Sequence, residues 1–180
     1  AGRCLAPLAH PGRVVLKATK SDETTDEPRF AEALTRAIAD PSADLDGDGQ
    51  TSLLEAWITA SKRTDDQYFS EGVAPEEHSL LCDRSDGRSL RPSEFEGVRR
   101  IKAKGSLPDD GLRAHQRHLV RASEDQALPA SARRERDELE RQLVLLSSRK
   151  PAEPNAGYDD KLEAILLRIA ELSFRDATAR

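Results

Sequence analysis

Residues 44–55 read D-L-D-G-D-G-Q-T-S-L-L-E, and no other stretch of the chain restricts its fold as strongly. Acidic side chains fall at the first, third and fifth positions, which are Asp44, Asp46 and Asp48. Gly49 follows at the sixth position, where a sharp turn favours a residue that adopts positive φ. Carboxylates this close together repel one another unless a cation lies between them. The spacing is that of an EF-hand calcium loop.

The pattern also predicts which atoms would hold the ion. Ca²⁺ takes six to eight oxygen ligands, and a carboxylate at the twelfth position of such a loop closes the site. We therefore predict one Ca²⁺ ion, bound by four carboxylates and one backbone carbonyl: Asp44, Asp46, Asp48, Gln50 (carbonyl) and Glu55. The alternative is an acidic turn that only caps the following helix, because Asp-Gly pairs form turns without any metal.

A second Asp-Gly turn occurs within residues 82–95 and looks like a degenerate copy of the first loop. Aligning Asp86 with the fifth position places Cys82 and Arg84 at the first and third positions. Neither a thiol nor a guanidinium is a hard oxygen ligand. We predict that this turn holds no metal and that Arg84 brings its positive charge near Asp83 or Asp86. The alternative is a plain tight turn.

Composition excludes several classes of protein. The net charge of the 180 residues is −5, which argues against a general nucleic-acid binder. No apolar run is long enough for a membrane span. The chain contains no methionine, not even at its start, so we expect a processed chain or a fragment of a longer precursor.

Hydrophobic periodicity predicts a mainly α-helical fold. Residues 29–40, 52–72, 92–102, 129–150 and 158–176 are expected to be helices, with further helical turns at 76–81. Pro41 should end the first helix before the acidic loop, which makes the site EF-hand-like rather than a regular EF-hand. Trp57 is expected to anchor the core. His115 and His118 have no cysteine or third histidine near them, so we predict no metal site there.

Strands are few in this sequence. Residues 13–19 predict one short buried strand, and 112–121 alternate weakly as a second strand would. A lone strand leaves its backbone unsatisfied, so we expect residues 14–16 to add to a sheet from another chain or a missing segment. The last two helices are joined by the breaker-rich residues 150–157 and should form an antiparallel helical hairpin.

Four stretches together resemble a group of large bacterial secreted or envelope proteins that carry a legumain-like, caspase-fold peptidase domain. These stretches are residues 11–21, 29–56, 77–87 and 111–121. The resemblance implies that the catalytic histidine and cysteine of such a domain lie upstream of Ala1, so we predict no catalytic residue in this chain. It also implies that the strand in residues 1–28 completes a caspase-like α/β sheet. The EF-hand-like region then covers 29–101, a connecting segment with a possible strand 102–128, and the helical hairpin 129–180.

The resemblance leads to one functional prediction and two alternatives. We predict a calcium-stabilised, non-catalytic structural subunit, secreted or in the cell envelope. Its partner would be another protein chain, such as the N-terminal part of the same precursor. The alternatives are the small subunit of a processed cysteine peptidase, with its dyad on the partner chain, and a calcium-dependent adhesion or scaffold module.

The two cysteines, Cys4 and Cys82, stand where the resembling proteins carry other residues. Disulfides persist in exported proteins, so we predict a Cys4–Cys82 bridge in such a context. Two unrelated buried thiols are the alternative.

Overall fold

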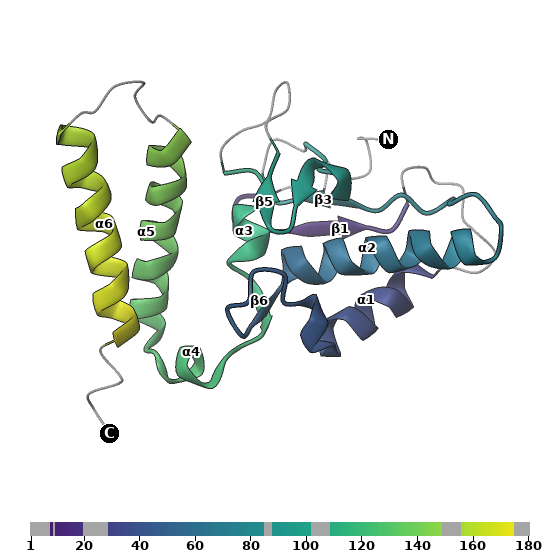
Figure 1. Ribbon diagram of the computed structural model, residues 1–180, viewed down its shortest axis with the longest axis horizontal. Helices are drawn as coiled ribbons and strands as arrows, with labels where there is room; N and C mark the ends of the chain where they lie inside the picture. Colours follow the sequence, from purple (N-terminus) through teal and green to yellow (C-terminus); the bar gives the residue numbers. More distant parts are fainter. Residues whose placement is uncertain are drawn as a thin grey trace. The chain divides into compact units, whose positions relative to one another are not determined.

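The computed structural model of the protein describes residues 8, 10–19, 29–84, 88–101, 109–148 and 156–174. The chain forms two compact units, Ala1–Arg121 and Ala122–Arg180. The described residues are mainly helical, as the sequence predicts, and three small antiparallel strand pairs belong to the first unit (Figure 1). The predicted connecting segment, residues 102–128, is divided between the two units.

Two helices form the core of the first unit. α1 (Phe30–Ala39) packs against α2 (Leu53–Ser70), and Trp57 on α2 is completely buried, which confirms its predicted role as a core anchor. Its ring meets Phe95 edge to face, with ring centroids 6.0 Å apart. An aromatic pair of this geometry adds about 1 kcal/mol to the burial of its surface. The other buried residues of this core are Phe30, Ala33, Ala37, Ala43, Leu54, Ala60, Leu81, Leu90 and Ala114.

Both ends of α1 have a local cause. The buried carboxylate of Glu77 accepts the first backbone N–H groups, including that of Arg29 at 2.7 Å, and so supplies acceptors that a helix start lacks. The helix stops before Pro41, as predicted, because a residue that precedes proline disfavours the α conformation. A single 3₁₀ turn, Pro41–Ala43, then leads into the acidic loop.

The predicted N-terminal strand forms and finds a partner within the chain. β1 (Val15–Lys17) pairs antiparallel with β3 (Leu80–Cys82), with Val15 opposite Cys82. Leu81 also exchanges backbone hydrogen bonds with Leu90, at 3.1 and 2.7 Å. The prediction of helical turns at residues 76–81 is therefore wrong. β1 has a strand partner within the chain, so the expectation that residues 14–16 depend on a strand from outside for their pairing is wrong. A caspase-like sheet stays a prediction.

Residues 92–102, predicted to be helical, instead form a tight hairpin. A 3₁₀ turn, Pro92–Glu94, leads into β4 (Phe95–Glu96), which pairs antiparallel with β5 (Arg99–Arg100). Gly97 between the strands has φ 56°, a left-handed conformation that ends any helix there. Of the apolar residues whose spacing suggests a helix, Phe95 and Val98 pack against the core, whereas Ile101 is exposed.

Two residues within the 44–55 segment take part in the third strand pair. β2 (Thr51–Ser52) pairs antiparallel with β6 (His118–Val120), which follows the short helix α3 (Leu112–His115). The weak alternation in residues 112–121 thus marks a strand in its second half only. Gly111 before α3 has φ 87°, and a Cβ there would lie 2.7 Å from the Phe95 ring, so this position requires glycine.

The second unit consists of three helices in the described residues: α4 (Ser123–Ala127), α5 (Ala130–Ser148) and α6 (Ala156–Phe174). α5 and α6 lie side by side and run in opposite directions (Figure 1). Arg168 of α6 reaches Glu135 near the start of α5 at 2.7 Å. None of the helices in the described residues has both the length and the apolar composition that a bilayer crossing requires.

Candidate metal centre

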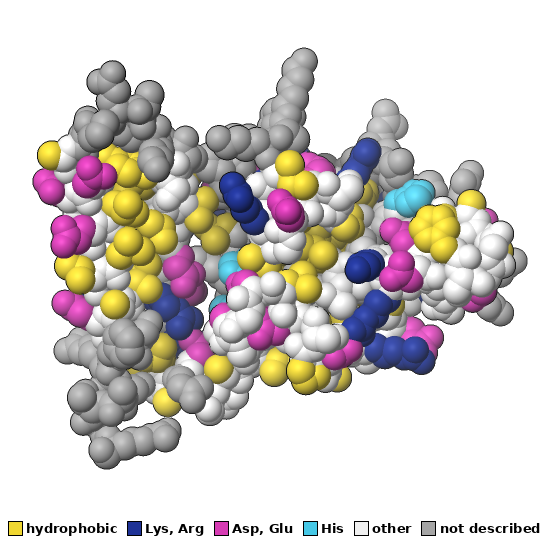
Figure 2. Space-filling view, viewed as in Figure 1, with side chains coloured by type: hydrophobic (Ala, Val, Ile, Leu, Met, Phe, Trp, Pro, Cys, Tyr) yellow, Lys and Arg dark blue, Asp and Glu magenta, His cyan; other side chains and the backbone are white. Residues whose placement is uncertain are grey.

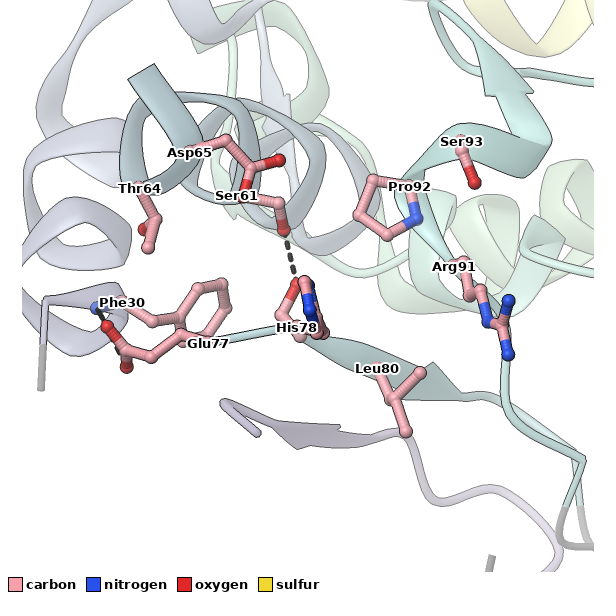
Figure 3. Close-up of a pocket in the computed structure, with 11 residues that line it drawn as sticks. Phe30, Ser61, Thr64, Asp65, Glu77, His78, Leu80, Arg91, Pro92 and Ser93 are labelled. Carbon is pink, nitrogen blue, oxygen red and sulfur yellow. Dashed lines mark hydrogen bonds between the residues drawn. The ribbon is translucent and has the colours of Figure 1, made fainter. Parts of the chain in front are cut away.

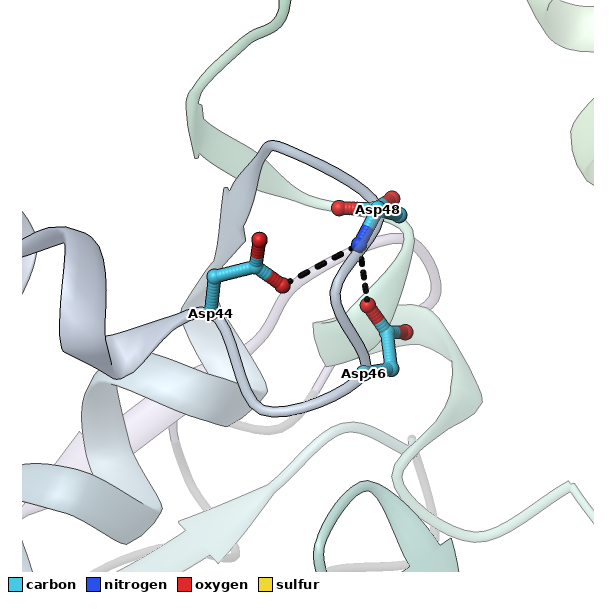
Figure 4. Close-up of side chains that lie close together, drawn as sticks. All are labelled: Asp44, Asp46 and Asp48. Atoms are coloured by element: carbon cyan, nitrogen blue, oxygen red, sulfur yellow. Dashed lines mark hydrogen bonds between the residues drawn. The ribbon is translucent and has the colours of Figure 1, made fainter.

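The acidic loop, residues 44–55, turns sharply between the 3₁₀ turn and the first turn of α2. Gly47 and Gly49 have φ values of 78° and 77°, and no atom lies within 4 Å of where a Cβ would stand at either. Glycine is therefore needed for its conformation and not for space. The two left-handed residues curl the chain so that successive aspartates face a common centre (Figure 4).

Backbone N–H groups hold the first aspartate in place. Asp44 Oδ1 accepts the N–H groups of Gly47 at 2.7 Å and Asp48 at 3.2 Å, and its Oδ2 accepts that of Gly49 at 2.9 Å. Asp46 accepts the N–H of Asp48 at 3.2 Å (Figure 4). The backbone thus positions two carboxylates without neutralising either.

Three carboxylates converge in this loop. Asp44, Asp46 and Asp48 each offer an oxygen atom, and these atoms all lie within 4.8 Å of one another. Partial burial raises the pKa of Asp46, and the charges of Asp48 and Glu55 raise it further, while His115 opposes them. The described residues supply no lysine or arginine ion pair to these three carboxylates. The loop therefore concentrates negative charge, and no lysine or arginine in the described part of the chain is paired with it.

Glu55 is hydrogen-bonded to the backbone at both ends of the acidic loop. Its side chain is fully buried, Oε1 accepts the N–H of Leu45 at 2.8 Å, and Oε2 accepts the N–H of Ser52 at 2.8 Å. Ser52 Oγ in turn accepts the N–H of Glu55 at 3.2 Å, which completes a capping box at the start of α2. Glu55 thus joins the loop to the helix, and its oxygens are occupied by backbone donors.

Gln50, the fifth predicted ligand, packs against Asp48. Its backbone N–H donates to Asp48 Oδ1 at 2.8 Å, and its side-chain Nε2 donates to Oδ2 at 3.0 Å. The side chain is buried, and its Oε1 has no hydrogen-bond partner in the described residues. Of the five predicted ligands, the structure brings three side chains together and places the other two residues directly beside them.

Two histidines that the sequence does not connect to the loop lie against it. His115 Nε2 is 3.4 Å from Asp46 Oδ2, and His118 Nε2 is 4.0 Å from Asp48 Oδ2. The β2–β6 pairing brings them there across more than sixty residues of chain. No local pattern signals this approach.

Residues on both sides of the second acidic turn form a different cluster, which we call the arginine-paired cluster. In it, Arg84, Arg88 and Arg100 pair with Asp109 and Asp110, and the buried Asp83 lies beside them. Arg84 pairs with Asp109 at 2.6 Å, and its predicted approach to Asp83 or Asp86 stays a prediction. Asp110 is approached by Arg88 at 3.3 Å and by Arg100 at 3.6 Å. Asp86 lies outside the described residues.

The predicted disulfide stays a prediction. Cys82 is buried in β3, opposite Val15 of β1. Cys4 lies outside the described residues.

Comparisons with protein-family models, with curated proteins and with solved structures found no match to this chain.

Proposed function

We propose that the acidic loop binds one Ca²⁺ ion and that the ion stabilises a non-catalytic structural subunit. The observation that supports this most directly is the convergence of three carboxylate oxygens within 4.8 Å. Carboxylates are hard oxygen donors, which Ca²⁺ prefers, and the charge that they place together is what a divalent cation offsets. The proposed ligands are Asp44, Asp46 and Asp48, with Gln50 and Glu55 completing the set.

Glu55 would bind the ion after giving up one of its hydrogen bonds to the backbone. It lies close enough to raise the pKa of Asp46 by its charge, yet its oxygens bind the N–H groups of Leu45 and Ser52. A small movement of its carboxylate toward the aspartates would release the Leu45 bond and keep the capping box. Calcium would then tie the loop to α2 directly.

Binding would stabilise more than the loop itself. Thr51 and Ser52 pair with β6, and Ser52 caps α2, so a rigid loop fixes one strand pair and the start of the longest helix in the first unit. With a dissociation constant on the order of 0.1 to 1 mM, as in extracellular calcium modules, 10 mM Ca²⁺ would stabilise the fold by about 1.4 to 2.7 kcal/mol.

Isothermal titration calorimetry with CaCl₂ tests the proposal. We expect one site per chain in the parent protein and loss of most binding in Asp48→Asn and Glu55→Gln. Asp66→Asn, an exposed carboxylate on α2, is the matched control and should bind as the parent does. A parent protein without calcium-dependent heat, or a Glu55→Gln variant with unchanged affinity, would contradict the proposal.

The second unit supports a role in an assembly. Its described residues bury only two apolar side chains well, those of Leu128 and Leu172. Leu166 and Leu167 on α6 are 47% and 58% exposed, and apolar side chains run along this pair of helices in Figure 2. Exposed apolar surface of this kind is characteristic of interaction sites.

We propose a second protein chain as the partner, with the N-terminal caspase-fold part of one precursor as its source. β1 could extend such a sheet, because only β3 pairs with it in the described residues. Native mass spectrometry of the complex purified from its source, with sequencing of the co-purifying chain, tests this. A partner with a Cys–His dyad would favour the peptidase alternative, and purification as a single species would contradict the assembly.

A further inference from the structure

A pocket of about 290 Å³ lies in the first unit and involves none of the residues of the acidic loop. Its walls come from α2, from the extended residues before β3, and from the 3₁₀ turn Pro92–Glu94 (Figure 3). Phe30, Leu80 and Pro92 supply apolar surface, and the remaining lining residues are polar or charged. The volume suits a small molecule or one long side chain.

The buried hydroxyl groups that line this pocket direct their hydrogens into the fold. Thr64 donates to the carbonyl of Ala60 at 2.9 Å, and Ser61 donates to the carbonyl of Trp57 at 2.7 Å. Ser61 and Ser79 also share a hydrogen bond of 2.5 Å (Figure 3). Because Ser61 has only one hydroxyl hydrogen, Ser79 must donate in this bond. The three hydroxyls therefore keep lone pairs for the pocket and no hydrogen.

Asp65 adds a charge to the same wall. Its carboxylate, one residue beyond Thr64 on α2, takes part in no hydrogen bond or ion pair with the described residues. Partial burial raises the pKa of Asp65, which His78 opposes and Asp66 reinforces. The wall formed by α2 and Ser79 thus consists of acceptors, one of them a carboxylate to which the described residues donate no hydrogen bond.

We propose that this pocket binds a primary ammonium group carried on a short apolar stem. An ammonium has three donors and no acceptor, so it complements Asp65 and the hydroxyl lone pairs. The methylene groups of the stem would lie against Phe30 and Leu80. A lysine side chain of a peptide and a free alkylamine share this chemistry.

Arg91 provides the test of the sign of the ligand charge. It is exposed at the pocket and carries the opposite charge to Asp65 (Figure 3). An ammonium ligand would be repelled by Arg91, whereas an anionic ligand would depend on it. Asp65→Asn and Arg91→Gln therefore form a matched pair, because each removes one charge from the same pocket.

The experiment is an NMR titration of the full chain with n-butylamine hydrochloride and, separately, with sodium butyrate. We expect the backbone amides of Asp65, Ser79 and Leu80 to shift with the amine and not with butyrate. Asp65→Asn should weaken amine binding about tenfold or more, while Asp65→Glu retains it and Arg91→Gln binds at least as tightly as the parent. Butyrate binding that Arg91→Gln abolishes, absence of amine shifts in the parent, or an Asp65→Asn variant that binds the amine normally would overturn the proposal.

A third probe identifies the source of the amine. Nα-acetyl-lysine N-methylamide binding about tenfold more tightly than n-butylamine would indicate a peptide lysine, because the pocket then also recognises backbone amides. Equal affinities would indicate a free amine. Ser79→Ala, which removes one neutral acceptor, should weaken both probes less than Asp65→Asn does.

Discussion

Two clusters of carboxylates in the described residues of the first unit differ in the arginines that pair with them. In the arginine-paired cluster, Asp109 and Asp110 lie within 3.6 Å of guanidinium groups. In the acidic loop, Asp44, Asp46 and Asp48 converge without an arginine or lysine ion pair from the described residues. The same repulsion is therefore offset by arginines in one place, whereas no lysine or arginine of the described residues pairs with the carboxylates in the other.

The two places also differ in burial. Asp83 and Asp110 are almost completely buried, whereas Asp46 and Asp48 are exposed and Asp44 is half-buried. A buried charge must have its partner within the fold, because desolvation is too costly otherwise. An exposed charge can exchange partners with solvent. The arginine-paired cluster thus suits a permanent structural role, and the acidic loop suits reversible binding.

The largest effect that we expect comes from removing a buried partner in the arginine-paired cluster. Arg100 is 9% exposed and approaches both Glu94, at 2.5 Å, and Asp110, at 3.6 Å. Arg100→Met leaves Asp110 buried with less compensation, so the free energy of unfolding should fall by about 3 to 5 kcal/mol. Urea denaturation measures it, with the exposed Arg99→Met as control.

Repeating the denaturation with calcium distinguishes the acidic loop from the arginine-paired cluster. Saturating Ca²⁺ should not restore the stability of Arg100→Met, because the acidic loop and the cluster use different carboxylates. Asp48→Asn, in contrast, should lose the stabilisation by calcium and little else. Full rescue of Arg100→Met by calcium, or a loss below about 1 kcal/mol, would show that the comparison is wrong.

A somewhat smaller effect should depend on pH. Burial raises the pKa of Asp83 to about 6 from 3.8, although the N–H groups of Gly111 and Arg113 and the charge of Arg113 oppose the rise, while Asp110 adds to it. The folded chain thus binds this proton more tightly than the unfolded chain does. The stabilisation is complete below about pH 4 and is lost as the pH rises through about 6, by at most about 3 kcal/mol.

The variant Asp83→Asn isolates this effect, because its side chain stays neutral. The difference in unfolding free energy between the parent and Asp83→Asn should change with pH between about 4 and 7, in the direction of a less stable parent at higher pH. Chemical denaturation at several pH values measures it. Two parallel stability curves would show that Asp83 does not titrate in this range.

The features that could be predicted from sequence are those with local causes. The helices α1, α2, α5 and α6 follow from apolar periodicity and from the breakers that flank them, whereas the short helix α4 is not predicted. The convergence of Asp44, Asp46 and Asp48 follows equally locally, from two glycines within the same few residues. Short-range signals suffice where the partners are near in sequence.

The two helices that the sequence wrongly predicts have different physical causes. Residues 92–102 form a local hairpin, in which Phe95 lies opposite Arg100 and Gly97 takes a left-handed conformation. Residues 76–81 fail because their partner is remote, since Leu81 pairs with β1. Strand pairing depends on a partner that sequence periodicity does not identify. The position of His115 beside Asp46 could not be predicted for the same reason, because the pairing of β2 with β6 brings it there from a distant part of the chain.

The smallest effect that we expect comes from replacing one glycine in the acidic loop and one beside the arginine-paired cluster. Gly49 in the acidic loop has φ 77° and open space around its Cβ position, so Gly49→Ala should lose only the conformational term, about 1 to 2 kcal/mol. Gly111 beside the arginine-paired cluster has φ 87°, and a Cβ there would lie 2.7 Å from Phe95. Gly111→Ala should therefore be clearly more destabilising, since it adds a clash to the same strain.

Asparagine tolerates the left-handed region, so Gly49→Asn should recover part of the loss and Gly111→Asn none. Thermal denaturation of the four variants without calcium checks this order. Equal losses at the two glycines would mean that the acidic loop is as tightly packed as the cluster. That result would remove the physical basis for assigning reversible binding to the acidic loop and a permanent structural role to the arginine-paired cluster.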